Sequence, residues 1–106
     1  MPQLLFYRYV DVRENKQIKK DKRIALAPGQ TFKYYTPDRY DRAADAQRFL
    51  ALSYPPHYRV GPIPDDELPN LHVQLRSVAP ANGQPGGGQE VATTQTLFLF
   101  EHFLLQ

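Results

Sequence analysis

The sequence predicts an α+β fold, with two helices in the first half of the chain and mostly antiparallel strands around a central cleft. Helical spacing of apolar residues is confined to the first half. Alternating apolar and polar residues, with runs of β-branched and aromatic residues, occupy the second half. A length of 106 residues corresponds to a single domain, residues 1–106, with room for one modest core and one pocket.

The composition excludes several classes of function. Hydrophobic residues make up 42% and charged residues 23% of the chain, as in a soluble globular protein, and the net charge of +2 is not that of a polycation. The absence of cysteine excludes disulfides, thiolate nucleophiles and cysteine-ligated zinc. The three histidines lack metal-ligand spacing, and even the longest apolar runs, such as Leu97–Phe100, are too short to span a bilayer. We therefore expect neither a metal site nor a membrane segment.

The first predicted strand, Leu4–Val10, places Arg8 among apolar side chains. Alternation puts Arg8 on the face of Phe6 and Val10, opposite Tyr7 and Tyr9. Burying an unpaired guanidinium is costly. Arg8 must therefore reach the rim, pair with an acid, or line a pocket that receives an anion, and these three placements remain open.

A short polar helix is expected next. Asp11 and Glu14 have the spacing of a capping box, in which Asp11 caps the helix and Glu14 reaches back to an N-terminal amide, and the helix should run to about Lys22. We interpret its cations as a solvated face, because a nucleic-acid patch would interleave aromatic residues for stacking. These cations are Lys16, Lys19, Lys20, Lys22 and Arg23.

A second, longer helix is predicted from about Pro37 to Leu52. Thr36 and Pro37 are typical of an N-cap and a first helical position, and Ala43, Ala46 and Leu50 form an apolar stripe. An extended segment, a turn and a strand are expected between the two helices, over Arg23–Ala27, Pro28-Gly29 and Thr31–Thr36.

The second half should consist mainly of strands. His57–Ile63 is predicted to be a strand that lies at a sheet edge or ends at its prolines, Pro62 and Pro64. Leu71–Val78 alternates as a strand with one wet face, and Glu90–Ala92 is a further short strand. Thr96–Leu105 is apolar on both faces and is predicted to be a central strand.

A glycine-rich stretch precedes an acid near the end of the chain. Four of the six glycines fall between Gly83 and Gly88, and Glu90 follows. We expect a flexible loop that delivers a carboxylate, either as a solvent-exposed hairpin loop or as a loop that wraps a nucleotide-like ligand. The stretch lacks the Gly-Lys-Ser/Thr ending of a phosphate-binding loop, and Ser53 and Ser77 lack a nucleophile-elbow context.

Three motifs follow one another along the chain: Tyr7-Arg8-Tyr9, Tyr34-Tyr35-Thr36-Pro37 and the stretch Gly83–Glu90. In this order they resemble the motifs of small ADP-ribosyltransferase-like toxin domains at the C-termini of bacterial polymorphic effectors. The segments Tyr35–Tyr40 and Tyr58–Pro64, with the Gln-Pro-Gly-Gly-Gly run, are also similar to necrotizing-toxin-type NAD glycohydrolases. The resemblance extends from about Tyr7 onward.

The resemblance implies a site that binds NAD as its substrate. Arg8 would anchor the NAD phosphate or ribose by charge-assisted hydrogen bonds. Tyr35, or failing it Tyr34, would pack on the nicotinamide. Glu90 would bind the nicotinamide ribose and stabilise the positive charge that develops as nicotinamide leaves, facing Arg8 and Tyr35 across one cleft. The predicted NAD-binding set is completed by Arg39 and Gln89.

Departures from the family patterns leave the reaction open. The Ser-Thr-Ser motif of one transferase class is absent, and Arg8 stands in place of the first-motif histidine of the diphtheria-toxin-like class. Glu90 stands where the glycohydrolases carry glutamine, which favours transfer over hydrolysis. Gly88 lacks the side chain that orients the acceptor in many transferases.

The sequence therefore predicts an NAD-dependent mono-ADP-ribosyltransferase of the toxin or effector type, acting on a macromolecule, with a protein acceptor favoured over nucleic acid. NAD glycohydrolase activity and a catalytically silent interaction module remain alternatives. The resemblance implies NAD as the substrate without a metal, and an immunity or antitoxin protein as a partner. It also implies action in the cytoplasm of a target cell, after delivery as part of a larger effector.

Overall fold

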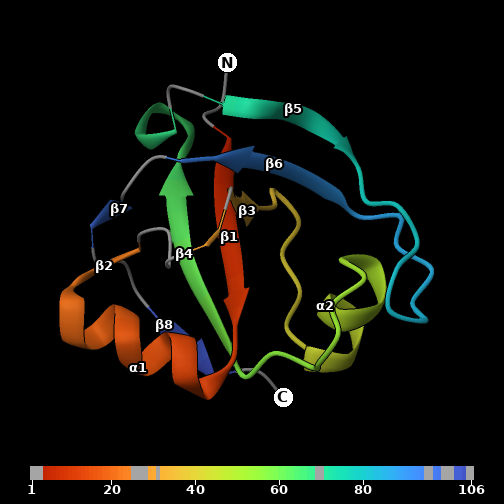
Figure 1. Cartoon of the computed structure of the whole chain (residues 1–106), viewed down its shortest axis with the longest axis horizontal. Helices are drawn as coiled ribbons and strands as arrows, with labels where there is room; N and C mark the ends of the chain where they lie inside the picture. The colour runs from red at the N-terminus through yellow and green to blue at the C-terminus, as the bar shows by residue number, and fades with distance from the viewer. Residues whose placement is uncertain are drawn as a thin grey trace.

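The computed structural model describes residues 4–24, 29–30, 32–68, 71–94, 97–98 and 102–104, which form antiparallel strands and two α-helices (Figure 1). The helices are α1 (Val12–Asp21) and α2 (Ala43–Phe49), and a 3-10 helix covers Asp65–Glu67. The strands are β1 (Leu5–Val10), β2 (Arg23–Ile24), β3 (Lys33–Tyr35), β4 (Tyr58–Pro64), β5 (Leu71–Ser77), β6 (Gln89–Thr93), β7 (Leu97–Phe98) and β8 (His102–Leu104). The predicted α+β class, with both helices in the first half, is confirmed. Within the described residues no helix has the length and apolar character needed to cross a membrane.

The described strands form three antiparallel sheets. Their strand orders are β1-β4-β8, β2-β7 and β3-β6-β5. One pair of backbone hydrogen bonds joins the first sheet to the third: the Tyr7 amide donates to the Thr36 carbonyl at 2.7 Å, and the Thr36 amide donates to the Tyr7 carbonyl at 2.9 Å. β1 therefore lies between β4 on one edge and the end of β3 on the other.

β1 is buried on both faces, and each face packs against a different helix. Phe6 and Val10 belong to the main core, together with residues of α1 and β4. Tyr7 and Tyr9 form a second cluster with Ala46 of α2. In Figure 1, α1 and α2 lie to opposite sides of β1 and β4. The predicted alternation along this strand is confirmed for these four residues.

α1 begins and ends as predicted. The Asp11 side chain accepts a hydrogen bond from the Glu14 amide at 2.7 Å, and Lys22 adopts the left-handed conformation that ends the helix. The Glu14 carboxylate turns to Arg8 instead of the N-terminal amide, so the second half of the predicted capping box is wrong.

α2 begins at Ala43 and not at Pro37, so the predicted start of this helix is wrong. Tertiary hydrogen bonds hold the preceding segment in a non-helical form. The Tyr9 hydroxyl accepts from the Tyr40 amide at 2.6 Å and donates to the Asp38 carbonyl at 3.0 Å. These backbone groups are satisfied from β1, and the local N-cap signal therefore does not decide the conformation.

β4 lies between β1 and β8, so the predicted edge position is wrong, but the strand ends at Pro64, as the other alternative predicted. A β-bulge accommodates its prolines: the register shifts between Phe6 and Arg8, so that Tyr7 lies opposite both Gly61 and Pro62. Among the described residues, β8 pairs with Tyr58, Arg59 and Val60, and both prolines of β4 lie beyond these pairs.

β5 is an edge strand with two register shifts, and in the described part of the chain it pairs only with β6. Leu71 pairs with Thr93 and Val73 with Ala92, which puts the two apolar residues on opposite faces. Leu75 is 45% exposed. The predicted single apolar face is wrong, because each bulged residue reverses the alternation.

The predicted central strand over Thr96–Leu105 is also wrong. Its described parts form β7, paired with β2, and β8, paired with β4, at the ends of two different sheets. β2 and β3 confirm the two extended segments expected before α2. The described residues do not include the rest of the predicted segment Arg23–Ala27, nor Pro28 and Thr31.

The glycine-rich stretch is anchored by backbone hydrogen bonds, contrary to the expected flexible loop. The amides of Gly86 and Gly88 donate to the carbonyls of Arg48 and Phe49, at the end of α2, at 3.1 and 2.9 Å. The Gly87 amide donates to a carbonyl just after β5 at 3.0 Å. The Gly86 and Gly88 amides satisfy carbonyls that a helix end leaves open, and the Gly87 amide is also bonded, so the three amides do not form a cradle for phosphate.

The same stretch is the connection of a β5–β6 hairpin, one of the two alternatives left open by the sequence. Its tip is a two-residue turn at Asn82-Gly83, closed by reciprocal hydrogen bonds between Ala81 and Gln84 at 3.2 and 2.8 Å. The φ angles of Asn82 and Gly83 are 54° and 74°, as a type I′ turn requires.

Two glycines of this loop form a matched pair for substitution. Gly86 and Gly83 have φ angles of 71° and 74°, so alanine would strain the backbone of both, by about 1 kcal/mol each. An alanine Cβ at position 86 would lie 2.5 Å from the Val78 carbonyl oxygen, whereas at position 83 it would meet nothing within 4 Å. We expect Gly86→Ala to lower the free energy of urea unfolding by roughly 1–3 kcal/mol more than Gly83→Ala. Equal losses would contradict the close packing of the loop.

Candidate functional site

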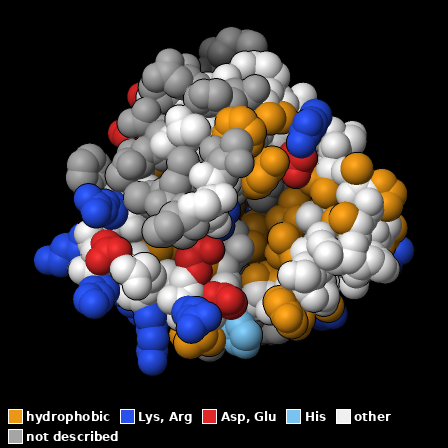
Figure 2. Space-filling view, in the orientation of Figure 1, with side chains coloured by type: hydrophobic (Ala, Val, Ile, Leu, Met, Phe, Trp, Pro, Cys, Tyr) orange, Lys and Arg blue, Asp and Glu red, His pale blue; other side chains and the backbone are white. Residues whose placement is uncertain are grey.

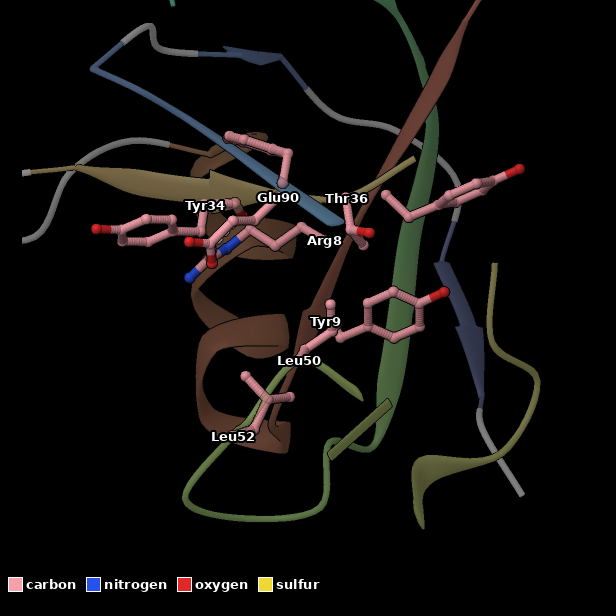
Figure 3. A pocket seen from close by; sticks show the side chains of 9 residues that line it. Arg8, Tyr9, Tyr34, Thr36, Leu50, Leu52 and Glu90 are labelled. Atoms are coloured by element: carbon pink, nitrogen blue, oxygen red, sulfur yellow. Dashed lines mark hydrogen bonds between the residues drawn. The ribbon is translucent and has the colours of Figure 1, made fainter. Parts of the chain in front are cut away.

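A pocket of about 270 Å³ lies between β1, β3 and the residues after α2. The face shown in Figure 2 is hollowed near its centre, and hydrophobic side chains line the hollow. In Figure 3, Glu90 lies at one end of the pocket, and Leu50 and Leu52 lie at the other. Four predicted site residues from three strands meet here. The wall is formed by Tyr7, Arg8, Tyr9, Tyr34, Tyr35, Thr36, Leu50, Leu52 and Glu90.

The pocket adjoins the gap where β1 and β3 diverge. The Tyr7–Thr36 bonds are the only backbone hydrogen bonds between these strands among the described residues. In a strand, the N–H and C=O groups of every second residue point to the same edge. The backbone groups of Tyr9, two residues after Tyr7, and of Tyr34, two residues before Thr36, therefore face the gap. In place of the next backbone pair, the Arg8 Nη1 group donates to the Tyr34 carbonyl at 2.9 Å.

Arg8 is held by an acid beneath the pocket. Its Nε and Nη2 groups donate to the two carboxylate oxygens of Glu14 at 2.6 and 2.9 Å, and Lys33 Nζ lies 3.7 Å from the same carboxylate. Burial opposes ionisation of Glu14, but hydrogen bonds and charge from Arg8, with Lys33, hold its pKa below the ordinary 4.5. Burial and the charge of Arg8 lower the pKa of Lys33. Two of the placements left open for Arg8 therefore occur together: it pairs with an acid and lines a pocket.

Glu90 lies directly opposite Arg76 of β5 in the sheet register. The Arg76 Nε group donates to Glu90 Oε2 at 2.9 Å, and the side chains of Arg76 and Glu90 are 52% and 18% exposed. An ion pair this accessible contributes at most about 1 kcal/mol to stability. Its main effect is to fix the direction of the Glu90 carboxylate.

Tyr34 and Tyr35 point to opposite faces of β3. The Tyr35 side chain is 1% exposed within the main core, and its hydroxyl has no hydrogen-bond partner in the described part of the chain. Burial raises the pKa of Tyr35 to about 12, although the charge of Arg8 opposes this shift. Tyr34 is 43% exposed and extends to the same side of the pocket as Arg8 (Figure 3). Of the two predicted aromatic contacts, Tyr34 is the one that a ligand can reach.

The two remaining predicted residues, Arg39 and Gln89, lie in a second pocket of about 670 Å³. Its other wall residues are Pro37, Asp38, Tyr40, Phe49, Ser77, Gly87 and Gly88. The two pockets adjoin, because three pairs of consecutive residues have one member in the wall of each pocket. These pairs are Thr36-Pro37, Phe49-Leu50 and Gln89-Glu90. The predicted NAD-binding set is therefore divided between neighbouring pockets.

Asp38 fixes the start of the strand that carries Glu90. Its Oδ2 atom accepts from the Gln89 amide at 2.7 Å and from the Tyr40 hydroxyl at 3.2 Å. A Cβ added at Gly88 would lie 2.7 Å from that hydroxyl, so a larger residue at position 88 would require the Tyr40 side chain to shift.

Sequence reasoning missed the partners of both charged residues in the first pocket. The sequence predicts Glu14 in a capping box and includes Arg76 in a strand with one wet face, without a partner for either side chain. The sequence does contain a signal for the pairing of Glu14: a strand with an isolated arginine is followed by a helix that carries an acid in its first turn. For Arg76 no local signal exists, because its pairing with Glu90 depends on the bulged register of β5.

Comparisons of the chain with protein-family models, with curated proteins and with solved structures give no match. The assignment of the pockets therefore depends on their own chemistry. Within the described residues, no cluster of three or more histidines and carboxylates is arranged to hold a metal ion.

The substitution Glu14→Gln tests the ion cluster beneath the pocket. We expect it to lower the free energy of unfolding by about 2 kcal/mol at about pH 7, because Arg8 and Lys33 stay partly buried without their acid. The pKa of Glu14 is below 4.5 in the folded chain, so as the pH falls the unfolded chain binds the proton first. The extra stability of the wild type over Glu14→Gln should therefore decrease as the pH falls, and disappear once the pH is below the pKa of Glu14 in the folded chain. Urea unfolding at a series of pH values measures both effects.

The control for this experiment is Glu67→Gln, at an exposed acid of the 3-10 helix. This variant should unfold within about 0.5 kcal/mol of wild type at each pH. A difference between wild type and Glu14→Gln that stays constant from about pH 5 to about pH 2 would contradict the ion pair.

Proposed function

We propose that the protein is an NAD-consuming enzyme of the toxin type, with an ADP-ribosyltransferase-like fold, which cleaves the nicotinamide–ribose bond and transfers ADP-ribose to a macromolecule. The observation that carries this proposal is the convergence of Arg8, Tyr34 and Glu90, from three strands, on one pocket. The sequence motifs suggested these residues for phosphate or ribose binding, nicotinamide packing and charge stabilisation. The divergence of the two sheets supports the expected cleft between antiparallel strands.

In this proposal NAD enters the pocket with its nicotinamide half. A volume of about 270 Å³ is just below the range of roughly 300–1,000 Å³ for whole small-molecule sites, so it suits part of a dinucleotide. The adenosine diphosphate half would extend toward the neighbouring pocket, where Arg39 and Gln89 lie. Tyr34 would pack against the nicotinamide ring, and Arg8 would bind a phosphate or ribose oxygen.

Glu90 would act on the charge that develops during bond cleavage. As the glycosidic C–N bond breaks, its electron pair leaves with neutral nicotinamide, and the ribose carbon gains oxocarbenium character. A carboxylate fixed beside the ribose stabilises that positive charge, more strongly in a water-excluded site. The acceptor nucleophile then bonds to the ribose carbon and loses its proton to solvent.

NAD hydrolysis is the second candidate, and position 88 favours it. Many transferases orient the acceptor with a side chain two residues before the catalytic acid. Here glycine supplies no such side chain, and a Cβ at this position would lie 2.7 Å from the Tyr40 hydroxyl and 3.0 Å from the Phe49 carbonyl oxygen. Water as the acceptor would yield free ADP-ribose.

Incubation with NAD labelled in its adenosine half, in the presence of a cell lysate, separates these reactions. Label on a macromolecule supports transfer. Free ADP-ribose and nicotinamide without a labelled macromolecule support hydrolysis. Intact NAD would contradict both and leave the catalytically silent interaction module.

Removal of the Glu90 carboxylate should abolish either reaction. We expect Glu90→Ala to slow nicotinamide release at least about 100-fold, the usual loss for a preorganised electrostatic contact. The free energy of unfolding should fall by no more than about 1 kcal/mol, because the pair with Arg76 is accessible to solvent. Glu67→Ala removes an exposed acid elsewhere and should retain full activity. A fully active Glu90→Ala protein would show that the site assignment is wrong.

Truncation of Tyr34 should weaken binding more than it affects the fold. We expect Tyr34→Ala to raise the KM for NAD roughly 5- to 30-fold, because aromatic stacking contributes about 1–2 kcal/mol. Tyr34→Phe keeps the ring and should stay within about threefold of wild type. The matched control is Tyr54→Ala, since Tyr54 is 75% exposed and lies outside both pockets. Steady-state kinetics with equal KM values for both alanine variants would count against the stacking role.

A further inference from the structure

A surface of unpaired cations covers the outside of α1 and the residues that end it; we call it the α1 basic surface. Figure 2 shows Lys and Arg side chains gathered over the region where Figure 1 draws α1. All members are exposed, and none takes part in an ion pair in the described part of the chain. The α1 basic surface consists of Arg13, Lys16, Lys20, Lys22 and Arg23.

Cations elsewhere are mostly matched by acids. Arg8, Lys33, Arg39, Arg59 and Arg76 each contact a carboxylate. Residues 11–23 contain six of the 13 cations and three of the 11 acids, which leaves seven cations and eight acids in the rest of the chain. The excess positive charge of the protein is therefore concentrated on α1, where the described residues do not neutralise it.

The α1 basic surface offers charge but no apolar anchor. α1 turns Asn15 and Ile18 inward, each 3% exposed, and Lys19 lies over the Tyr58 ring at 5.8 Å. Apart from Val12 at its start, its exposed residues are polar or charged. Protein interfaces are centred on buried aromatic and aliphatic anchors, membrane-bound helices insert an apolar face, and single-stranded nucleic acid stacks on aromatic rings. None of these partners suits the surface.

We propose that the α1 basic surface is more than the solvated face expected from the sequence, and that it binds the phosphate backbone of double-stranded nucleic acid, which needs no aromatic stacking, without reading its sequence. Lysine and arginine contacts to phosphate position a protein on a duplex and carry no sequence information. At a helical rise of about 1.5 Å per residue, Arg13 and Lys20 are roughly 10 Å apart along α1. That distance spans about three phosphates of one strand, at about 3.4 Å each along the duplex axis. Where the proposed transfer activity holds, the bound duplex becomes a candidate acceptor.

The test uses fluorescence anisotropy of the whole protein with a labelled duplex of about 20 base pairs, without NAD, over a series of salt concentrations. We expect the logarithm of the binding constant to fall with the logarithm of salt with a slope of about −3, and equally for two unrelated sequences. Lys16→Gln/Lys20→Gln should weaken binding roughly tenfold or more at low salt and reduce the slope to about −1. Absence of duplex binding would overturn the proposal.

The matched control is Arg42→Gln/Arg48→Gln, which removes two exposed cations beside and within α2. Its affinity should stay within about twofold of wild type. If the two double substitutions weakened duplex binding equally, the proposal would be overturned. It would also be overturned if the protein bound the single strand, anionic vesicles or a polyglutamate peptide as tightly as the duplex or more tightly. Circular dichroism checks that each variant is folded. The binding assay contains no NAD, so its result does not depend on NAD cleavage. Loss of duplex binding and loss of NAD cleavage can therefore be observed independently, and the two proposals are tested separately.

Discussion

Two backbone hydrogen bonds between Tyr7 and Thr36 join the sheet of β1, β4 and β8 to the sheet of β3, β6 and β5. Beyond this point β1 and β3 separate, and each is paired through its other edge, β1 with β4 and β3 with β6. The Arg8 guanidinium crosses the gap to the Tyr34 carbonyl where a further backbone pair would otherwise form. The first pocket therefore lies where the two sheets diverge, and its walls are formed by strands of both sheets and by the residues after α2.

The position of Glu90 depends on contacts made away from the pocket. Asp38 binds the Gln89 amide, and the glycine amides of the β5–β6 loop satisfy the last carbonyls of α2. Gly88 allows this approach because a Cβ would collide with the Tyr40 hydroxyl. The loop, α2 and β6 thus form one hydrogen-bonded unit, which holds the Glu90 backbone in place before any ligand binds, as electrostatic preorganisation requires.

Features that depend on neighbouring residues could be predicted from the sequence, and features that depend on register could not. The two faces of β1 and the Asp11 cap follow from local spacing, and both are confirmed. The start of α2 at Ala43 is decided by hydrogen bonds from Tyr9, which lies far away in the chain. The same holds for the candidate site: the motifs brought Arg8 and Glu90 to attention, but their counter-ions follow from helix placement and from two bulges in β5.

The counter-ions leave both charged residues of the pocket able to bind a ligand. A guanidinium has five N–H donors. Arg8 uses three of them on Glu14 and the Tyr34 carbonyl, and the other two have no acceptor among the described residues. Glu90 accepts from Arg76 through Oε2, and within the described residues Oε1 has no partner. Because an isolated buried ion would be strongly unfavourable, these pairs allow a cation and an acid to line one pocket before it is occupied. A fitting ligand presents an acceptor to Arg8 and a hydroxyl donor to Glu90, and the phosphates and ribose hydroxyls of a nucleotide supply both.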